Sequence, residues 1–166
     1  MIEDGAGLEP AQLETYFALM ESVSLLQHHV EQQLRAEGDV SYVQFQLLAR
    51  LADAQGRLTM TELADGVVYS RSGLTYQAGL LENAGLVTRG PGADDERVTV
   101  VTLTDAGRAL LARVLPGHVQ VVRALLFDPI PAAEARRLGG TMARVRDHMR
   151  AQPPRSATPR RKQSRT

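Results

Sequence analysis

The chain of 166 residues contains no cysteine and no tryptophan, and only one of its 19 basic residues is a lysine, Lys162. The missing cysteines exclude disulfides, thiolate metal sites and redox sensing through sulfur. Aromatic residues make up only 4% of the chain, so a core has to be built from leucine, valine and alanine. With 43% hydrophobic and 23% charged residues, the composition is that of a globular protein rich in helices.

Long apolar runs are also missing, since no uninterrupted stretch approaches about 18 residues. The chain starts with the acidic segment MIEDGAGLEP, which lacks the apolar part of a signal peptide. We therefore expect a cytoplasmic protein that does not contact a membrane.

Charge is balanced overall but unevenly distributed. Residues 151–166 carry five basic residues and no acid, whereas the rest of the chain has 14 basic and 19 acidic residues, a net charge of −5. From Pro153 onward the composition is mainly proline, serine, threonine and arginine without an apolar pattern. This composition predicts a disordered basic tail over residues 151–166.

The first predicted helix is long. Apolar residues recur at helical spacing from Leu13 to Leu34, and Pro10 and Gly38 stand where a helix could begin and end. At about 1.5 Å per residue this helix would span nearly 40 Å, which is more than one small lobe can cover. The region 1–40 is therefore predicted to be a dimerisation helix.

Three shorter helices follow, each with its own start signal. Ser41 and Gln44 form a capping box, and the helix that they open ends before Gly56. Thr59 and Glu62 form a second box at the start of a short helix, and Ser70 caps a third helix that reaches about Ala84. Two short helices separated by a few residues indicate a helix-turn-helix.

The chain changes character after Gly85. Residues 86–89 and 97–103 are rich in β-branched side chains and predict a two-stranded hairpin with a charged tip. Thr104 caps a long helix that is expected to be interrupted or kinked at Pro116–Gly117, and a last helix covers residues 132–149. The predicted fold is mainly α with a β-wing: a winged helix-turn-helix lobe over 41–104 and further dimerisation helices over 105–150.

The helix after Ser70 has an outward face suited to DNA. Ser72, Thr75 and Tyr76 lie on this face with Arg71 at its flank, and the helix N-terminus favours a phosphate. A merely solvated face is the alternative. Between Ser41 and Thr104 there are five basic and seven acidic residues, although a DNA-binding domain is usually basic. Positive charge must therefore be concentrated on a few arginines.

Six short motifs in register resemble the MarR family of bacterial transcriptional regulators. They are Glu-Leu-Ala at 62–64, Ser70 with Leu-Thr at 74–75, Leu-Glu-x-x-Gly-Leu-Val at 81–87, Arg89, Asp-x-Arg at 95–97 and Leu-Thr-x-x-Gly at 103–107. The resemblance implies a homodimer with interlocked terminal helices, whose two lobes bind a pseudo-palindromic double-stranded DNA operator. It also implies that Arg97 enters the minor groove and that Asp95 holds it.

The residues predicted to bind DNA are Ser70, Arg71, Ser72, Thr75, Tyr76, Arg89, Asp95 and Arg97. Two positions depart from the family pattern, because Glu96 and Tyr76 stand where basic residues are common. For Asp95 and Arg97 the alternative is a surface ion pair that stiffens the hairpin, worth about 0–1 kcal/mol.

Other kinds of site have weaker support. The four histidines have no recognisable metal-ligand spacing, and no catalytic motif or cofactor site is found, so an enzyme is not expected. The resemblance implies a small aromatic effector, for which we expect a pocket at Gly38 and Asp39, lined by apolar residues of helices 10–35 and 41–54 with few polar groups. Tyr16 and Phe17 could border such a pocket, although ordinary core packing is favoured.

The predicted function is a sequence-specific DNA-binding transcriptional regulator, a repressor relieved by a small aromatic ligand. The alternative from another class is a winged-helix protein-interaction module without specific DNA binding, which the acidic balance of the lobe permits.

Overall fold

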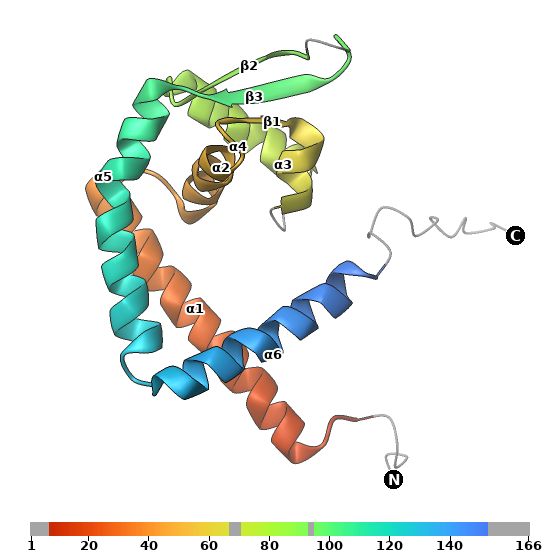
Figure 1. Cartoon of the computed structure of the whole chain (residues 1–166), viewed down its shortest axis with the longest axis vertical. Helices are drawn as coiled ribbons and strands as arrows, with labels where there is room; N and C mark the ends of the chain where they lie inside the picture. Colours follow the sequence, from red (N-terminus) through yellow and green to blue (C-terminus); the bar gives the residue numbers. More distant parts are fainter. Residues whose placement is uncertain (1–6, 67–70, 93–94, 153–166) are drawn as a thin grey trace, which may run out of the picture. The chain divides into compact units, whose positions relative to one another are not determined.

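The computed structural model describes residues 7–66, 71–92 and 95–152 (Figure 1). The elements in chain order are α1 (Pro10–Gly38), α2 (Tyr42–Asp53), β1 (Arg57–Thr59), α3 (Met60–Gly66), α4 (Arg71–Asn83), β2 (Val87–Pro91), β3 (Thr99–Leu103), α5 (Asp105–Val122), the π-helical turn η1 (Arg123–Phe127) and α6 (Ala132–Arg150). The chain forms two compact units, one up to Leu125 and one from Leu126. The order of helices and hairpin confirms the predicted winged helix-turn-helix lobe.

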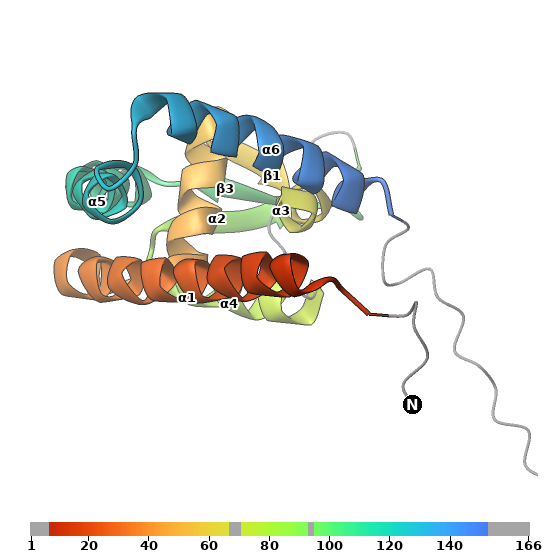
Figure 2. The ribbon, with the colours of Figure 1, turned by 90° about the horizontal axis from the view of Figure 1, so that it is seen from below.

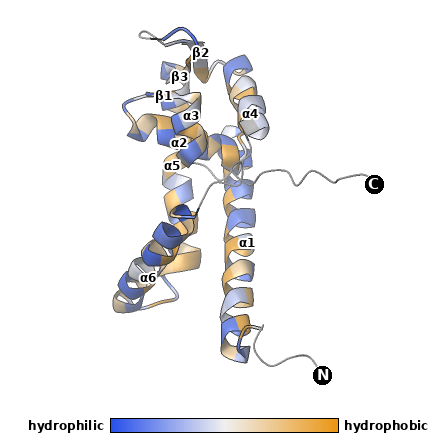
Figure 3. Cartoon of the chain, turned by 90° about the vertical axis from the view of Figure 1, so that its right-hand side faces the viewer, coloured by the Kyte–Doolittle hydropathy of each residue, from blue (hydrophilic) through white to orange (hydrophobic). Residues whose placement is uncertain are grey.

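Helix α1 is buried only toward its C-terminal end. It begins with Pro10 in its first turn, and Val30 and Leu34 are 2% and 0% exposed. Apolar residues continue along the rest of the helix (Figure 3) but are not covered, and Phe17 is 63% exposed. The expected core packing of Tyr16 and Phe17 is therefore wrong for a single chain, because no other element of their unit covers them.

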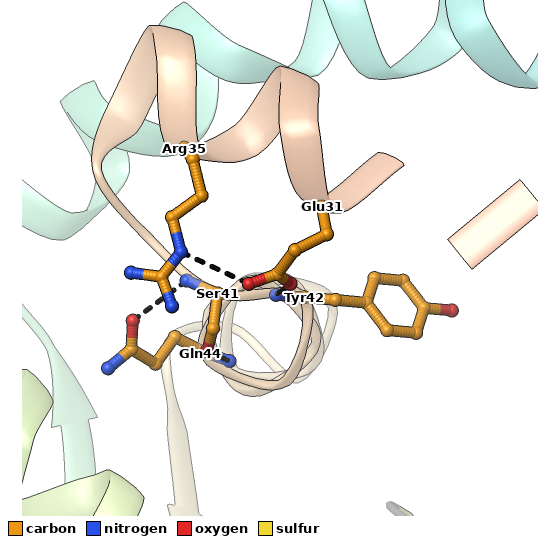
Figure 4. A network of polar contacts seen from close by, with 5 residues as sticks. All are labelled: Glu31, Arg35, Ser41, Tyr42 and Gln44. Carbon is orange, nitrogen blue, oxygen red and sulfur yellow. Dashed lines mark hydrogen bonds and ion pairs between the residues drawn. The ribbon is translucent and has the colours of Figure 1, made fainter. Parts of the chain in front are cut away.

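The start of α2 is tied to α1. Ser41 and Gln44 form the predicted capping box, in which Ser41 Oγ accepts from the Gln44 N–H and Gln44 Oε1 accepts from the Ser41 N–H. The carboxylate of Glu31 accepts a hydrogen bond from the backbone N–H of Tyr42 and also pairs with Arg35 (Figure 4). Because α2 lies crosswise to α1 (Figure 2), a carboxylate from α1 can reach the positive N-terminal end of α2 and join the long helix to the lobe.

Three antiparallel strands form the sheet of the lobe, in the order β1-β3-β2. The central strand β3 places Val101 opposite Leu58 on one side and opposite Arg89 on the other. Strand β1 was not predicted, because its three residues are too few for a recognisable alternation. The second hairpin strand begins at Thr99, two residues later than predicted.

A single apolar core holds the lobe, α5 and the end of α1 together. Its buried members are Val30, Leu34, Val40, Phe45, Leu47, Leu48, Leu51, Leu63, Leu74, Leu81, Val87, Val101, Leu103, Leu110 and Val114. Helix α5 approaches the lobe closely at Gly107, where an added Cβ would lie 2.3 Å from the carbonyl oxygen of Leu86. Only glycine therefore fits this position of the Leu-Thr-x-x-Gly motif.

Helix α5 continues through Pro116–Gly117, so the predicted interruption is wrong, while the alternative of a kink stays a prediction. Gly117 leaves room for the Glu37 side chain of α1, whose Oε1 would lie 2.3 Å from a Cβ at this position. The helical stretch Asp105–Phe127 is long and apolar enough, by length and composition alone, to cross a membrane. Two of its apolar residues, Leu110 and Val114, belong to the core described above.

The second unit contains α6, in which no residue is buried. Its predicted apolar stripe is present and exposed within this unit, with Leu138, Val145 and Met149 at 41%, 37% and 66%. An uncovered apolar stripe of this kind indicates a surface made for packing against another element or chain.

Candidate nucleic-acid interface

Helix α4 has one buried and one exposed face, as its sequence predicts. Leu74, Ala78 and Leu81 are at most 2% exposed and hold the helix on the core. Ser72, Thr75 and Tyr76 lie on the opposite side, and Tyr76 is 65% exposed. Tyr76 is thus the most exposed large apolar side chain in the described part of α4, followed by Leu80 at 36%.

Two of the predicted DNA-binding residues cannot be placed. Ser70 and the side chain of Arg71 lie outside the described residues, although α4 begins at Arg71. The expected phosphate site at the N-terminus of α4 therefore stays a prediction.

The helix before α4 in the helix-turn-helix begins at the second predicted capping box. Glu62 Oε2 accepts hydrogen bonds from the backbone N–H and the hydroxyl of Thr59, both at 2.8 Å, and Thr59 Oγ1 accepts from the Glu62 N–H. The backbone hydrogen bond from Thr59, followed by the one from its hydroxyl, lowers the pKa of Glu62 below its usual value. The charged carboxylate is thus stabilised at the start of α3, as the helix dipole favours.

The turn at the tip of the wing orients Arg97. Asp95 Oδ1 accepts a hydrogen bond from the backbone N–H of Arg97 at 3.0 Å and lies 3.7 Å from its Nε. The side chain of Arg97 is 95% exposed, whereas that of Asp95 is 54% exposed. Because the pair is so exposed, its own contribution to stability is close to zero. Its clearer effect is to present a guanidinium group away from the body of the lobe.

Arg89 is placed differently from Arg97, the other predicted arginine whose side chain is described. Its backbone N–H and Nε donate to the carboxylate of Glu82 at 3.0 and 2.8 Å, and Nη2 lies 2.6 Å from Glu82 Oε2. These contacts to Arg89 lower the pKa of Glu82, and the guanidinium hydrogen bond is the largest cause. Sequence reasoning missed this pair, whose only signal is the seven-residue spacing across the turn at Gly85.

The unfavourable charge balance of the lobe is partly explained by these contacts. Glu82 and Asp95 each pair with an arginine, and Glu62 caps a helix. Three of the seven acids therefore have structural partners and do not form a separate acidic surface.

An open cavity of about 280 Å³ lies at the elbow between α1 and α2. Gly38 and Asp39 border it, as expected, but the apolar lining comes mainly from α4, α5 and the turn between α4 and β2: Leu80, Leu81, Ala84, Leu86 and Leu110. Arg113 and Gln44 also line it. The expectation of an apolar lining from helices 10–35 and 41–54 is thus wrong, because the C-terminal half of α4 reaches under the elbow. The expectation of few polar groups is also wrong, because Asp39, Gln44 and Arg113 line the cavity.

No group of three or more potential metal ligands converges within the described ranges. The neighbouring rings of His28 and His29 lie edge to face, with centroids 5.7 Å apart.

Comparison with known proteins gives the same family in three ways. The family model described as MarR family matches residues 38–98. The helix-turn-helix transcriptional repressor YetL of Bacillus subtilis is 30% identical over 125 residues, which cover 75% of this chain and 74% of YetL.

Solved structures agree in fold. Sco3205, a MarR family transcriptional regulator from Streptomyces coelicolor crystallised in complex with DNA, superimposes with a TM-score of 0.83 at 32% identity, covering 91% of this chain and 94% of that chain. AbsC, another MarR family transcriptional regulator from Streptomyces coelicolor, superimposes with a TM-score of 0.83 at 27% identity, covering 89% of this chain and 100% of the AbsC chain.

Proposed function

This chain belongs to the MarR family of transcriptional regulators, and on that premise we propose that it is a sequence-specific DNA-binding repressor that acts as a homodimer. The observation that carries the proposal is the pairing of two exposed elements in one lobe. The exposed face of α4 carries the uncharged side chains of Ser72, Thr75 and Tyr76, and the wing exposes Arg97, whose backbone N–H donates to Asp95. The proposed activity is DNA binding, not catalysis.

Each element has a distinct role in this proposal. Helix α4 enters the major groove, where small hydroxyl side chains allow close approach and Tyr76 reaches base edges. Arg97 enters the adjacent minor groove, whose narrow walls concentrate negative potential. The relative Sco3205, crystallised with DNA, supports assigning this activity to the shared fold.

Apolar surface supports the homodimer. The exposed large apolar residues of α1 and of the segment just before it are Leu8, Leu13, Tyr16, Phe17, Leu19, Met20, Val23 and Leu25. Monomeric soluble proteins rarely leave such a continuous apolar surface in water. A second copy of the chain, bringing its own terminal helices, is the partner that the family resemblance implies. Two lobes held in this way would meet half-sites about 10 bp apart, one turn of DNA.

We further propose that a small aromatic acid relieves repression by binding the cavity at the elbow. The cavity offers an apolar wall from Leu81 and Leu110, and the guanidinium of Arg113 to bind a carboxylate. Because the cavity touches both α4 and the elbow, an occupant could favour a different arrangement of lobe and long helices.

The alternative function is a winged-helix module that binds another protein. The excess of acidic over basic residues between Ser41 and Thr104 favours it. The two functions differ in salt dependence, since binding to DNA weakens steeply with salt because counterions are released from phosphates.

The decisive experiment is selection of genomic fragments by the purified full-length protein, followed by affinity measurement at two salt concentrations. Enrichment of a pseudo-palindromic fragment, with affinity that falls as salt rises, is the expected result. Fragments no better bound than random duplex DNA would contradict the proposal and favour the protein-interaction module. The variant Tyr76→Ala serves as the control for contact through α4.

A further inference from the structure

The contact between Glu82 and Arg89 joins the recognition helix to the wing. Glu82 belongs to the last turn of α4, and Arg89 is the third residue of β2. The carboxylate of Glu82 contacts three groups of Arg89, namely its backbone N–H, Nε and Nη2. The side chain of Arg89 is 29% exposed and that of Glu82 is 34% exposed, so this pair is less hydrated than the pair of Asp95 and Arg97 at the wing tip.

Both ends of this contact are anchored in rigid structure. Leu81, next to Glu82, is 2% exposed, and Arg89 is paired across the ladder with Val101, which is 1% exposed. The guanidinium also lies over the exposed side of α4, because a Cβ added at Gly79 would be 3.7 Å from its Nη2. The pair thus spans the seam between the face of α4 and the base of the wing.

Beyond this seam strand β1 accompanies β3 as far as Val100, which pairs with Thr59, and from Thr99 to the tip the described wing consists of its own two strands. The register continues with Gly90 opposite Val100 and Pro91 opposite Thr99, and then reaches the turn that carries Arg97. A two-stranded ribbon of this kind is flexible in isolation. The direction of the wing relative to α4 therefore depends on two junctions, the pairing of β1 with β3 and the place where β2 leaves α4.

We propose that Glu82 is a positioning residue which, through Arg89, fixes the angle between α4 and the wing, so that both reach DNA without a further ordering step. The proposal rests on the proposed function. A wing that had to be ordered at the moment of binding would lose part of the affinity gained from Arg97. In this role Glu82 and Arg89 affect DNA binding by fixing the position of the wing and do not contribute a net charge.

The first test uses Arg97 as the reporter of wing position. Affinity for the selected operator is measured for Arg97→Ala in the wild-type background and again in the Glu82→Gln background. We expect Glu82→Gln to weaken operator binding about tenfold. In the Glu82→Gln background, the fold-loss of affinity caused by Arg97→Ala should be less than half of the fold-loss that the same substitution causes in the wild-type background. Equal factors for Arg97→Ala in both backgrounds would overturn the proposal.

Salt dependence distinguishes positioning from direct phosphate contact. Glu82→Gln should lower the slope of log affinity against log salt by no more than Arg97→Ala does, because its effect acts through Arg97, whereas loss of a separate phosphate contact lowers the slope by about 0.9 in either background. If Arg89→Gln lowers the salt slope by about 0.9 and Arg97→Ala causes the same fold-loss of affinity in both backgrounds, Arg89 contacts a phosphate directly and the positioning role is refuted. Asp147→Asn, which removes the carboxylate of an exposed arginine pair in α6, is the matched control.

A second readout needs no DNA and separates failure of this inference from failure of the proposed function. The absence of native cysteine allows spin labels at Asn83→Cys in α4 and Glu96→Cys in the wing. In samples diluted with unlabelled chains, Glu82→Gln should broaden the distance distribution between the two labels. An unchanged distribution would overturn the proposal even if the operator is bound. Arg89→Lys, which keeps the charge but loses the fork geometry, provides the same comparison if Glu82→Gln does not fold.

Discussion

The imidazole ring of His118 in α5 lies against the ring of Phe45 in α2, with centroids 4.5 Å apart and planes tilted by 43°. Burial lowers the pKa of His118 below its usual value near 6.5, because the charged form loses hydration. The native state therefore holds this proton less tightly than the unfolded state. The resulting stabilisation is complete above the unfolded pKa and is lost as the pH falls through the lowered native pKa.

We predict that the thermal midpoint of the wild-type protein falls as the pH is lowered from 7.5 to 5.5. The thermal midpoint of the His118→Phe variant should fall less over the same range. Phenylalanine can keep the contact with Phe45 but cannot take up a proton. Thermal unfolding at four pH values measures this, and His148→Phe, the same substitution at an exposed position, is the control. Parallel pH dependence in wild type and His118→Phe would contradict the prediction.

Arg97→Ala should weaken binding to every DNA sequence by a similar factor. Its side chain is almost fully exposed and its expected contact is with the shape and backbone of the minor groove. The salt slope should decrease by about one phosphate equivalent or less. Fluorescence anisotropy at two salt concentrations checks this, with Arg146→Ala as the control for loss of one positive charge. Unchanged affinity would reduce Asp95 and Arg97 to an ion pair that stiffens the hairpin.

Tyr76→Ala should change the order of preference among operator variants. A base-edge contact discriminates between sequences by about 1–3 kcal/mol per position, whereas a phosphate contact does not. Tyr76→Phe separates the role of the ring from that of the hydroxyl, and uracil in place of thymine tests contact with the thymine methyl group. Equal weakening of all variants would assign Tyr76 to packing or to the DNA backbone.

A charge placed on the exposed apolar face of α1 should separate the dimer. Phe17→Glu is expected to raise the dimer dissociation constant at least about 30-fold, the scale of an interface hot spot. Light scattering over a dilution series measures the change, and Gln32→Glu adds the same charge at an exposed polar position of α1. A wild-type protein that is a folded monomer at micromolar concentration would contradict the proposed homodimer.

Salicylate-like acids should weaken operator binding, with a coupling of about 1–3 kcal/mol that corresponds to roughly 5-fold to 150-fold. Arg113→Gln should reduce the effect of the acid more than it reduces operator affinity without the acid, because Arg113 is the cation in the cavity lining. Operator titration with and without the compound, together with thermal shift of the free protein, provides the measurement. A compound that stabilises the free protein but leaves operator affinity unchanged would not be an effector.

The sequence by itself determined the features that depend on neighbours along the chain. The capping boxes at Ser41 and Thr59 formed as predicted, because each needs only residues three positions apart. The side chain of Asp95 meets Arg97 for the same reason, since two residues separate them in one turn. The face of α4 that carries Tyr76 follows from the period of 3.6 residues per turn. Periodicity and spacing are local, so they can be read without knowing what packs against them.

Only the tertiary structure decided the features that join distant segments. Strand β1 exists because β3 offers it a partner, and three residues carry too little pattern to predict it. The same is true of Glu31 at the start of α2 and of the cavity beneath the elbow. Arg89 shows the limit most clearly, because the family motif placed it among the predicted DNA-binding residues, but spacing gave no sign of the contact with Glu82 that folding creates. An ionised side chain engages the partner that the fold brings near it, and sequence spacing does not reveal that partner.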